Sequence, residues 1–269
     1  MARRLAVVGA GKLGSTLLRA LLGSGALAAD EVEATVKHDE SAAELADRLG
    51  IAAATDNRAA VEGAEVVLLA VKPQALAEVV TQLAPVLAPG QLLVSIVASA
   101  TTGFIEERLP LPLPVVRAMP NTPALVGAGM TVLCGGRHAG GEHLRRAEQL
   151  FHAVGRTMVL DEKHMDAVTA LSASGPAFVY VVLESLAEGG VKVGLPRELA
   201  TELAAQTMLG AAQMVLTTRE HPAKLKDVVT TPAGCTIDGI LELEEGGLRV
   251  TLIKSVVKAA ERAKQLIDG

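Results

Sequence analysis

The chain has 269 residues, half of them hydrophobic, and a formal net charge of −5 at pH 7, which suits two domains better than one small domain. Charges of both signs are interspersed and aromatic residues are scarce, so the composition lacks the basic patch and the stacking platforms of nucleic-acid-binding proteins. The only cysteines, Cys134 and Cys235, are too few for a disulfide scaffold and favour a reducing compartment. We therefore expect a cytoplasmic protein without a membrane span.

A short apolar run, Leu5 to Val8, has the form of a strand that is buried on both faces. It leads into a glycine-rich turn and then into a helix that we expect to continue to about Ser24. Glycines in such a turn permit a tight bend, close approach to a pyrophosphate and close packing of helix on strand, so the turn predicts a dinucleotide-binding site. The residues of this turn are Gly9, Ala10, Gly11, Lys12, Leu13 and Gly14.

The second strand, expected from about Val32 to Val36, should end beside the adenosine ribose of the dinucleotide. An NAD site favours Asp or Glu at this point, whereas Lys37 and His38 follow the strand here. A cation favours the additional 2′-phosphate, so we predict a preference for NADPH, with NADH as the alternative. The alternative holds if Lys37 and His38 only form a solvated turn and Asp39 selects the cofactor.

Strands and helices continue to alternate up to about Leu160, which is typical of a doubly wound α/β sheet. The carboxyl ends of parallel strands meet at one edge, where the cofactor crosses such a sheet. We therefore predict a Rossmann-type dinucleotide-binding domain over residues 1–162. The expected elements are a helix at 41–49, a short segment at 51–54, strands at 66–71 and 92–97, helices at 74–87 and 102–109, a strand from 115, a strand at 130–134, a helix at 141–152 and a strand at 157–159.

After Lys163 the strand-like runs largely disappear and helical patterns take over. The first helix is expected from His164 to about Val193, with Pro176 in its interior, where a proline should kink it. Small residues occur on all faces of the later helices, which favours burial against a second subunit. We predict an all-α dimerisation domain over residues 163–269. The remaining helices are expected at 197–216, 236–244 and 248–267.

A threonine-rich stretch near the end of the chain has the composition of an anion site. Thr231 before Pro232 has the form of a helix N-cap followed by proline at the first helical position. The small residues Ala233 and Gly234 leave the free N–H groups of a first helical turn open to a carboxylate or a phosphate. The hydroxyls of Thr231 and Thr236 can donate to an anion or to a polarised nitrogen. An ordinary capped helix explains the same residues equally well.

Five motifs spread over both predicted domains occur together in one protein family. They are GAGKLG at 9–14, AVKP at 70–73, AMPNTP at 118–123, ALSASGPAF at 170–178 and the run from His221 to Gly247 that contains VTTPAGCTI. In this combination and order the chain resembles the pyrroline-5-carboxylate reductases, which catalyse the last step of proline biosynthesis. The resemblance implies a Rossmann domain, a helical dimerisation domain and reduction of a cyclic imine by NADPH or NADH. It also implies self-association as a dimer, with a decamer of dimers as a larger form.

The resemblance further implies where substrate and cofactor bind. Substrate contacts fall on Gly234, Cys235 and Thr236, with Thr231 nearby. Thr236 is the candidate catalytic residue, because its hydroxyl suits the ring nitrogen of 1-pyrroline-5-carboxylate while the N–H groups near Gly234 suit the carboxylate. Two positions depart from the family pattern, with Ala173 where glycine is usual and Cys235 where alanine is common. The implied cofactor contacts outside the glycine-rich turn are Asn57, Ala70, Val71, Lys72, Pro73, Ile96, Val97 and Ala98.

Two other classes of function stay open at this point. A related dehydrogenase acting on a β-hydroxy acid or another imine would need a lysine of the helical domain as acid or base. A cofactor-sensing binding protein would keep the nucleotide fold without turnover. None of the six histidines has the spacing of a metal ligand, so no metal site is predicted. The candidate lysines are Lys163, Lys192, Lys224, Lys226 and Lys254.

Overall fold

The computed structural model describes residues 4–265 and divides into two compact units. The first unit runs to Ser174 and also includes the segment from Lys258 onward, whereas the second is Gly175–Val257. The first unit therefore extends past the domain boundary predicted after residue 162. It does so because Asp166 and Ser172 bond to side chains of the sheet and its loops.

An eight-stranded sheet forms the centre of the first unit. Its strands are β1 (Leu5–Val8), β2 (Val32–Thr35), β3 (Ala52–Ala54), β4 (Val66–Leu69), β5 (Leu92–Ser95), β6 (Val115–Met119), β7 (Gly129–Gly135) and β8 (Gly155–Val159). Their spatial order is β3-β2-β1-β4-β5-β6-β7-β8, and all neighbours are parallel except β6 and β7. The order reverses between β1 and β4, which opens the crevice that binds dinucleotides in doubly wound folds.

The antiparallel strand β7 is a feature that the sequence pattern did not indicate. Only residues 120–128 link β6 to β7, and they form the 3-10 helix η3 (Thr122–Val126) rather than a full crossover. Parallel neighbours need a crossover of a dozen or more residues, so β7 runs back along β6. The next link contains the helix α6 (Gly141–His152), and β8 is accordingly parallel to β7.

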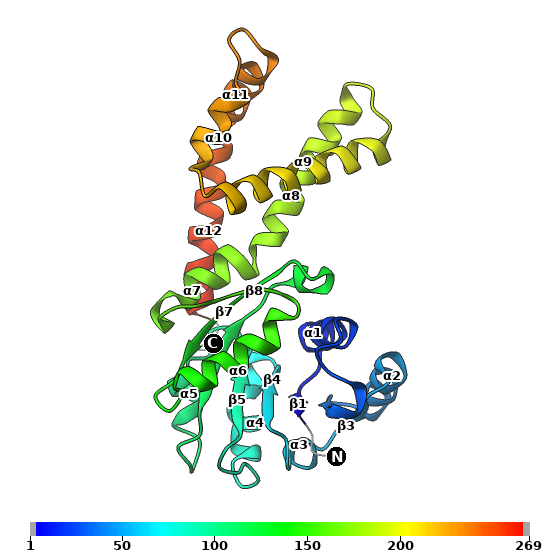
Figure 1. The fold of residues 1–269 in the computed structure, drawn as a ribbon, viewed down its shortest axis with the longest axis vertical. Helices are drawn as coiled ribbons and strands as arrows, with labels where there is room; N and C mark the ends of the chain where they lie inside the picture. The colour runs from blue at the N-terminus through cyan, green and yellow to red at the C-terminus, as the bar shows by residue number, and fades with distance from the viewer. Residues whose placement is uncertain (1–3, 266–269) are drawn as a thin grey trace. The chain divides into compact units, whose positions relative to one another are not determined.

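Helices cover both faces of this sheet (Figure 1). Successive strand residues point to opposite faces, so Leu5 and Val7 join one core while Ala6 and Val8 join the other. The first core includes side chains of α1 (Lys12–Gly23), α2 (Asp39–Leu49) and α6. The second includes side chains of α3 (Asn57–Val61), α4 (Leu76–Leu83) and α5 (Thr102–Glu106).

The strands and helices predicted for this unit are present, with shifted ends. Helix α2 begins at Asp39 instead of Ser41. Strands β4 and β5 end two residues earlier than predicted, at Leu69 and Ser95. In both places the chain leaves the ladder early, so the residues that follow belong to loops at the carboxyl edge of the sheet.

The long helix predicted from His164 to Val193 is divided into shorter segments. They are the 3-10 turn η4 (Glu162–His164), α7 (Met165–Val168), a π-helical turn η5 (Thr169–Ala173) and α8 (Gly175–Lys192). Pro176 has no N–H to donate to the carbonyl of Ser172, four residues before it. That carbonyl accepts a hydrogen bond from Nδ2 of Asn121 at 3.2 Å instead. The proline interrupts the helix as predicted, and a loop after β6 satisfies the carbonyl that it leaves free.

In the second unit, α8 and α9 (Arg197–Thr218) fold back on each other as a helical hairpin (Figure 1). A Cβ on Gly190 would lie 3.0 Å from the Cβ of Ala200, so glycine permits this close approach. Glu188 and Arg197 form an ion pair at 2.5 Å across the turn. The chain continues through α10 (Pro222–Val228), which the sequence did not predict, then α11 (Cys235–Glu245) and α12 (Leu248–Lys264). The predicted end of the last helix, Ile267, lies outside the described residues.

The second unit leaves most of its large apolar side chains exposed. Its only buried side chains are Ala187, Ala200 and Ala204. Eighteen of the 24 exposed large apolar side chains in the described part of the chain belong to it, among them Tyr180 and Leu209. By length and composition alone, the helical run from residue 162 to 192 would suffice to cross a membrane. The same run forms the hairpin with α9, so its exposed face needs a covering surface of some kind.

Candidate active site

The glycine-rich turn after β1 has the backbone that a pyrophosphate site requires. Gly9 adopts a φ of +82°, and a Cβ there would lie 3.0 Å from the Cα of Val71. The N–H groups of Gly9 and Ala10 both donate to the carbonyl of Thr35, which fixes the turn against the end of β2. Gly11 faces open space apart from the turn itself. The turn therefore presents bare backbone at the start of α1, which fits a bound dinucleotide.

Other residues of the turn hold the first helix on the sheet. A Cβ on Gly14 would lie 3.1 Å from the Cβ of Ala70, so this glycine permits close packing of α1 on the end of β4. Ala10 is buried, Leu13 is half-buried and Lys12 is exposed. Only Lys12 therefore offers the solvent a charged group from this turn.

A hydrogen-bonded chain connects the turn to Asn57. The hydroxyl of Thr35 accepts from the N–H of Gly9 at 3.2 Å and donates to Oδ1 of Asn57 at 2.6 Å. Nδ2 of Asn57 donates in turn to Oε1 of Gln82 at 2.9 Å. Thr35 is fully buried, so this chain satisfies polar groups beneath the turn. Asn57 lies at the carboxyl edge of the sheet, where the sequence predicted a cofactor contact.

The residues after β2 bear on the choice between the two nicotinamide cofactors. Lys37 and His38 are exposed, and neither side chain has a hydrogen-bond or ion-pair partner among the residues that the structure describes, although the carbonyl of His38 accepts from the N–H of Ala42. Asp39 is the first residue of α2, and its carboxylate accepts a hydrogen bond from the hydroxyl of Thr55 at 2.9 Å. The cation nearest the strand end is therefore available to a phosphate, while the carboxylate is already engaged.

The remaining predicted cofactor residues follow two further strands. Ala70, Val71, Lys72 and Pro73 follow β4, and Ile96, Val97 and Ala98 follow β5. The N–H of Ala70 donates to the carbonyl of Val8 at 2.8 Å, and that of Ile96 to Leu69 at 3.0 Å. The structure thus brings the predicted cofactor residues to the carboxyl ends of β1, β2, β3, β4 and β5.

The helix start predicted at Thr231 is wrong. The N-cap of α11 is Gly234, and Thr231 begins a turn in which its carbonyl accepts from the N–H of Gly234 at 3.0 Å. Pro232 takes the second position of this turn and Ala233 the third, with a φ of +56°. Proline suits the second position of a β-turn as well as it suits a first helical position, so the local signal supports both structures.

The predicted substrate residues gather at the start of α11 in the second unit. The first-turn N–H groups belong to Cys235, Thr236 and the residue after them, and no side chain caps them. Thr231 and Cys235 are exposed and Thr236 is half-buried. Neither threonine hydroxyl has a hydrogen-bond partner among residues 4–265. A Cβ on Gly234 would meet the hydroxyl of Thr231 and lie 3.1 Å from its carbonyl oxygen, so a side chain at this point would require Thr231 to shift.

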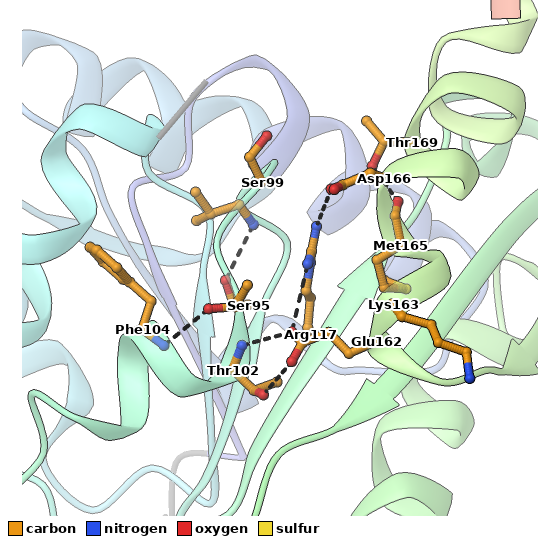
Figure 2. A network of polar contacts seen from close by, with 12 residues as sticks. Ser95, Ser99, Thr102, Phe104, Arg117, Glu162, Lys163, Met165, Asp166 and Thr169 are labelled. Carbon is orange, nitrogen blue, oxygen red and sulfur yellow. Dashed lines mark hydrogen bonds and ion pairs between the residues drawn. The ribbon is translucent and has the colours of Figure 1, made fainter. Parts of the chain in front are cut away.

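A buried arginine on β6 was missed at the level of sequence. Figure 2 shows the guanidinium of Arg117, only 2% exposed, between the carboxylates of Glu162 and Asp166. Each carboxylate lies 3.6 Å from one terminal nitrogen. The N–H and hydroxyl of Thr102 donate to Glu162 at 2.7 and 2.8 Å. The signal was a single charge inside the apolar strand Val115–Met119, which predicts a buried ion pair.

A cavity of about 450 Å³ lies beside this network, and its walls include Ser99, Arg117 and Lys264. Cys134 lies opposite Arg117 on β7 and is also buried. Burial, and then the negative charge of Glu162, raises the pKa of the Cys134 thiol to about 12. This thiol is therefore protonated at neutral pH and unsuited to act as a nucleophile or metal ligand.

Three of the five lysines that another dehydrogenase would use are engaged in ion pairs. Lys224 pairs with Glu220 and Lys226 with Asp227 on the surface. Lys163 pairs with Asp161 at 3.4 Å. No group of three or more potential metal-ligating side chains occurs among the described residues.

The reversed strand order, the glycine-rich turn and the polar chain beneath it define a dinucleotide-dependent oxidoreductase with an added helical region. Comparison with known families agrees with this class. The model for coenzyme F420-dependent NADP oxidoreductases matches residues 4–99, and the model for the pyrroline-5-carboxylate reductase dimerisation region matches residues 162–266.

Individual relatives narrow the class to one family. The chain is 40% identical to a pyrroline-5-carboxylate reductase of Methanosarcina acetivorans, over 98% of each chain, and 42% identical to one of Glycine max, over 97% and 95%. A crystal structure of the Plasmodium falciparum pyrroline carboxylate reductase with NADP bound is similar with a TM-score of 0.89, at 29% identity and 98% coverage of each chain. The chain belongs to the pyrroline-5-carboxylate reductase family.

Proposed function

We propose that the chain reduces 1-pyrroline-5-carboxylate to L-proline with NADPH, the last step of proline biosynthesis. The observation that carries this proposal is that the chain belongs to the reductase family along almost its whole length. The glycine-rich turn before α1 and the uncapped start of α11 support it. Neither the glycine-rich turn nor the start of α11 would by itself distinguish this reaction from other reductions by a nicotinamide cofactor.

On the cofactor side, the bare backbone of the glycine-rich turn would hold the pyrophosphate. Lys37, exposed and without a partner among the described residues, would contact the 2′-phosphate. The strand ends after β4 and β5 would line the rest of the cofactor. The bound dinucleotide would supply the hydride that reduces the carbon–nitrogen double bond.

On the substrate side, the N–H groups at the start of α11 would hold the carboxylate. The hydroxyl of Thr236 would donate a hydrogen bond to the ring nitrogen. An imine whose nitrogen accepts this hydrogen bond is polarised for attack by the hydride, so orientation by these groups would contribute most of the rate acceleration. This division of roles needs no lysine or histidine as an acid.

The second unit supports self-association. Its exposed apolar side chains lie within the segment that matches the family's dimerisation region. We propose that a second copy of the chain covers them, in place of a lipid bilayer, and that the dimer is the functional unit. A decamer of dimers and a cytoplasmic location stay predictions from the sequence.

The direct test is an assay of NADPH oxidation with the cyclic imine, run beside NADH at equal concentration. We expect proline as the product and a higher kcat/KM with NADPH. No turnover with either cofactor, in protein that is folded and dimeric, would refute the proposed reaction.

The role of Thr236 is tested by Thr236→Val. If the hydroxyl delivers a proton, kcat should fall; if it only orients the ring, KM for the imine should rise. Loss of one hydrogen bond corresponds to a change of about three- to tenfold in either constant. A lowered melting temperature with unchanged kinetics would assign Thr236 to helix packing instead.

A further inference from the structure

Ser99 holds a backbone conformation that serine rarely adopts. It lies in the loop between β5 and α5, with a φ of +66°. Left-handed backbone is disfavoured for residues with a Cβ, so a neighbouring interaction must hold it in place. Ser99 is also only 9% exposed.

The side chain of Ser99 supplies such an interaction. Its hydroxyl donates a hydrogen bond to the carbonyl of Ala263, which belongs to the last turn of α12. The last four carbonyls of a helix have no partner within the helix. Ser99 therefore caps the end of α12 from the loop after β5, across 164 residues of sequence. Both residues belong to the first compact unit.

The segment between β5 and Ser99 is thus fastened at both ends. At its start, the N–H of Ile96 donates to Leu69 at 3.0 Å, and that of Val97 to the hydroxyl of Ser95 at 3.3 Å. At its end, Ser99 is bonded to α12. The intervening Ile96, Val97 and Ala98 are the residues proposed to contact the cofactor.

We propose that Ser99 is a positioning residue for the cofactor: its bond to Ala263 holds the Ile96–Ala98 segment in the conformation that binds NADPH. The inference rests on the proposed function, because it takes this segment as part of the cofactor site. Ser99 acts through the segment and through α12, so the first expected effect is on cofactor affinity.

Two substitutions separate the hydroxyl from the backbone conformation. Ser99→Ala removes the hydrogen bond and keeps the cost of a left-handed residue with a Cβ. Ser99→Gly also removes the bond, but glycine adopts this φ freely. If the hydroxyl positions the segment, both variants should bind NADPH about three- to tenfold more weakly, although Ser99→Gly should melt at the higher temperature.

Thr101→Ala is the matched control. Thr101 lies two residues after Ser99, and its hydroxyl caps α5 by accepting a hydrogen bond from the N–H of Phe104. Loss of this hydroxyl should destabilise the same loop while the bond between Ser99 and α12 is kept. We expect a lowered melting temperature and an unchanged Kd for NADPH.

The chain has no tryptophan, so the fluorescence of NADPH itself can report its Kd in each protein. Wild-type affinity in Ser99→Gly, or an equal loss of affinity in Thr101→Ala, would overturn the proposal. Turnover of the imine is measured in parallel. A wild-type protein that binds NADPH without reducing the imine would refute the proposed reaction but leave the comparison of affinities intact.

Discussion

The two compact units differ in where their apolar side chains go. In the first, leucine, valine and isoleucine fill both sides of the sheet, and the structure buries them within one chain. In the second, the buried core consists of three alanines, and large apolar side chains face outward. The first unit can therefore draw its stability from its own core, whereas the second depends on apolar area that one chain leaves open.

Because of this difference, cofactor binding and imine reduction should depend on different parts of the molecule. The predicted cofactor residues lie in the unit with a complete core, and the predicted substrate residues lie in the unit without one. Cofactor binding should then survive changes that prevent association, and imine reduction should not.

The largest effect is expected from a charge on the open apolar face. Leu209 of α9 is 59% exposed, and Leu209→Glu would place a carboxylate where we expect a second copy to pack. The variant should sediment as a monomer at micromolar concentration and lose more than about tenfold of its kcat/KM, yet bind NADPH normally. A more exposed apolar residue of the first unit, Val126, serves as the control, and Val126→Glu should change neither property. A dimeric, fully active Leu209→Glu protein would contradict the comparison.

The second effect concerns the place where the chain passes from one unit to the other. Asn121 bonds to the carbonyl of Ser172 and, at 2.9 Å, to the N–H of Met130. Asn121→Ala leaves both groups without this partner and should lower the free energy of unfolding by about 1–3 kcal/mol, measured in urea. Pro176→Ala restores an N–H that can serve Ser172, so the cost of Asn121→Ala should shrink in that background. Strictly additive effects would show that the two residues are not coupled.

The third effect should be confined to the first unit. Lys37→Glu should raise KM for NADPH about tenfold, with a much smaller change for NADH, because a carboxylate repels the 2′-phosphate and accepts from a 2′-hydroxyl. Steady-state kinetics with both cofactors measures this, and light scattering should report an unchanged dimer. Equal changes in KM for the two cofactors would show that Lys37 does not contact the 2′-phosphate.

The smallest effect is expected within the second unit. The hydrogen bond and charge of Arg197 lower the pKa of Glu188 below its ordinary value. A lowered pKa in the folded state adds stability above the unfolded pKa, and this stability is lost as the pH falls through the folded value. Glu188→Gln should therefore lower the melting temperature slightly at pH 7, and the difference from wild type should vanish in acid. Both side chains are more than half exposed, so a large effect at any pH would be unexpected.

Much of the first unit could be predicted because its signals are local. Buried parallel strands form continuous apolar runs, and the turn at Gly9 has a spacing with few other uses. The ion pairs of Arg117 could not be located in this way, since Glu162 and Asp166 follow it by dozens of residues. The sequence shows that a buried arginine needs partners but not which carboxylates supply them.

The remaining errors arise where one local pattern supports two structures. Thr231 followed by proline fits a helix start and a β-turn equally, and the positive φ of Ala233 decides between them. Alanine gives no advance sign of such a φ, and neither does serine at Ser99. The predicted substrate residues nevertheless lie together in the structure, because the helix begins only a few positions later, at Cys235.

The π-helical turn at Thr169–Ala173 has a consequence for how this chain tolerates insertions and deletions. A π turn holds one residue more than the corresponding α turn. Each residue of an α-helix turns its direction by about 100°, so removing one residue between Thr169 and Leu171 would carry the carbonyl of Ser172 around the helix axis and away from Asn121. Pro176 would still lack its N–H, and that carbonyl would then have neither partner. This stretch should therefore tolerate a change of residue type better than a change of length.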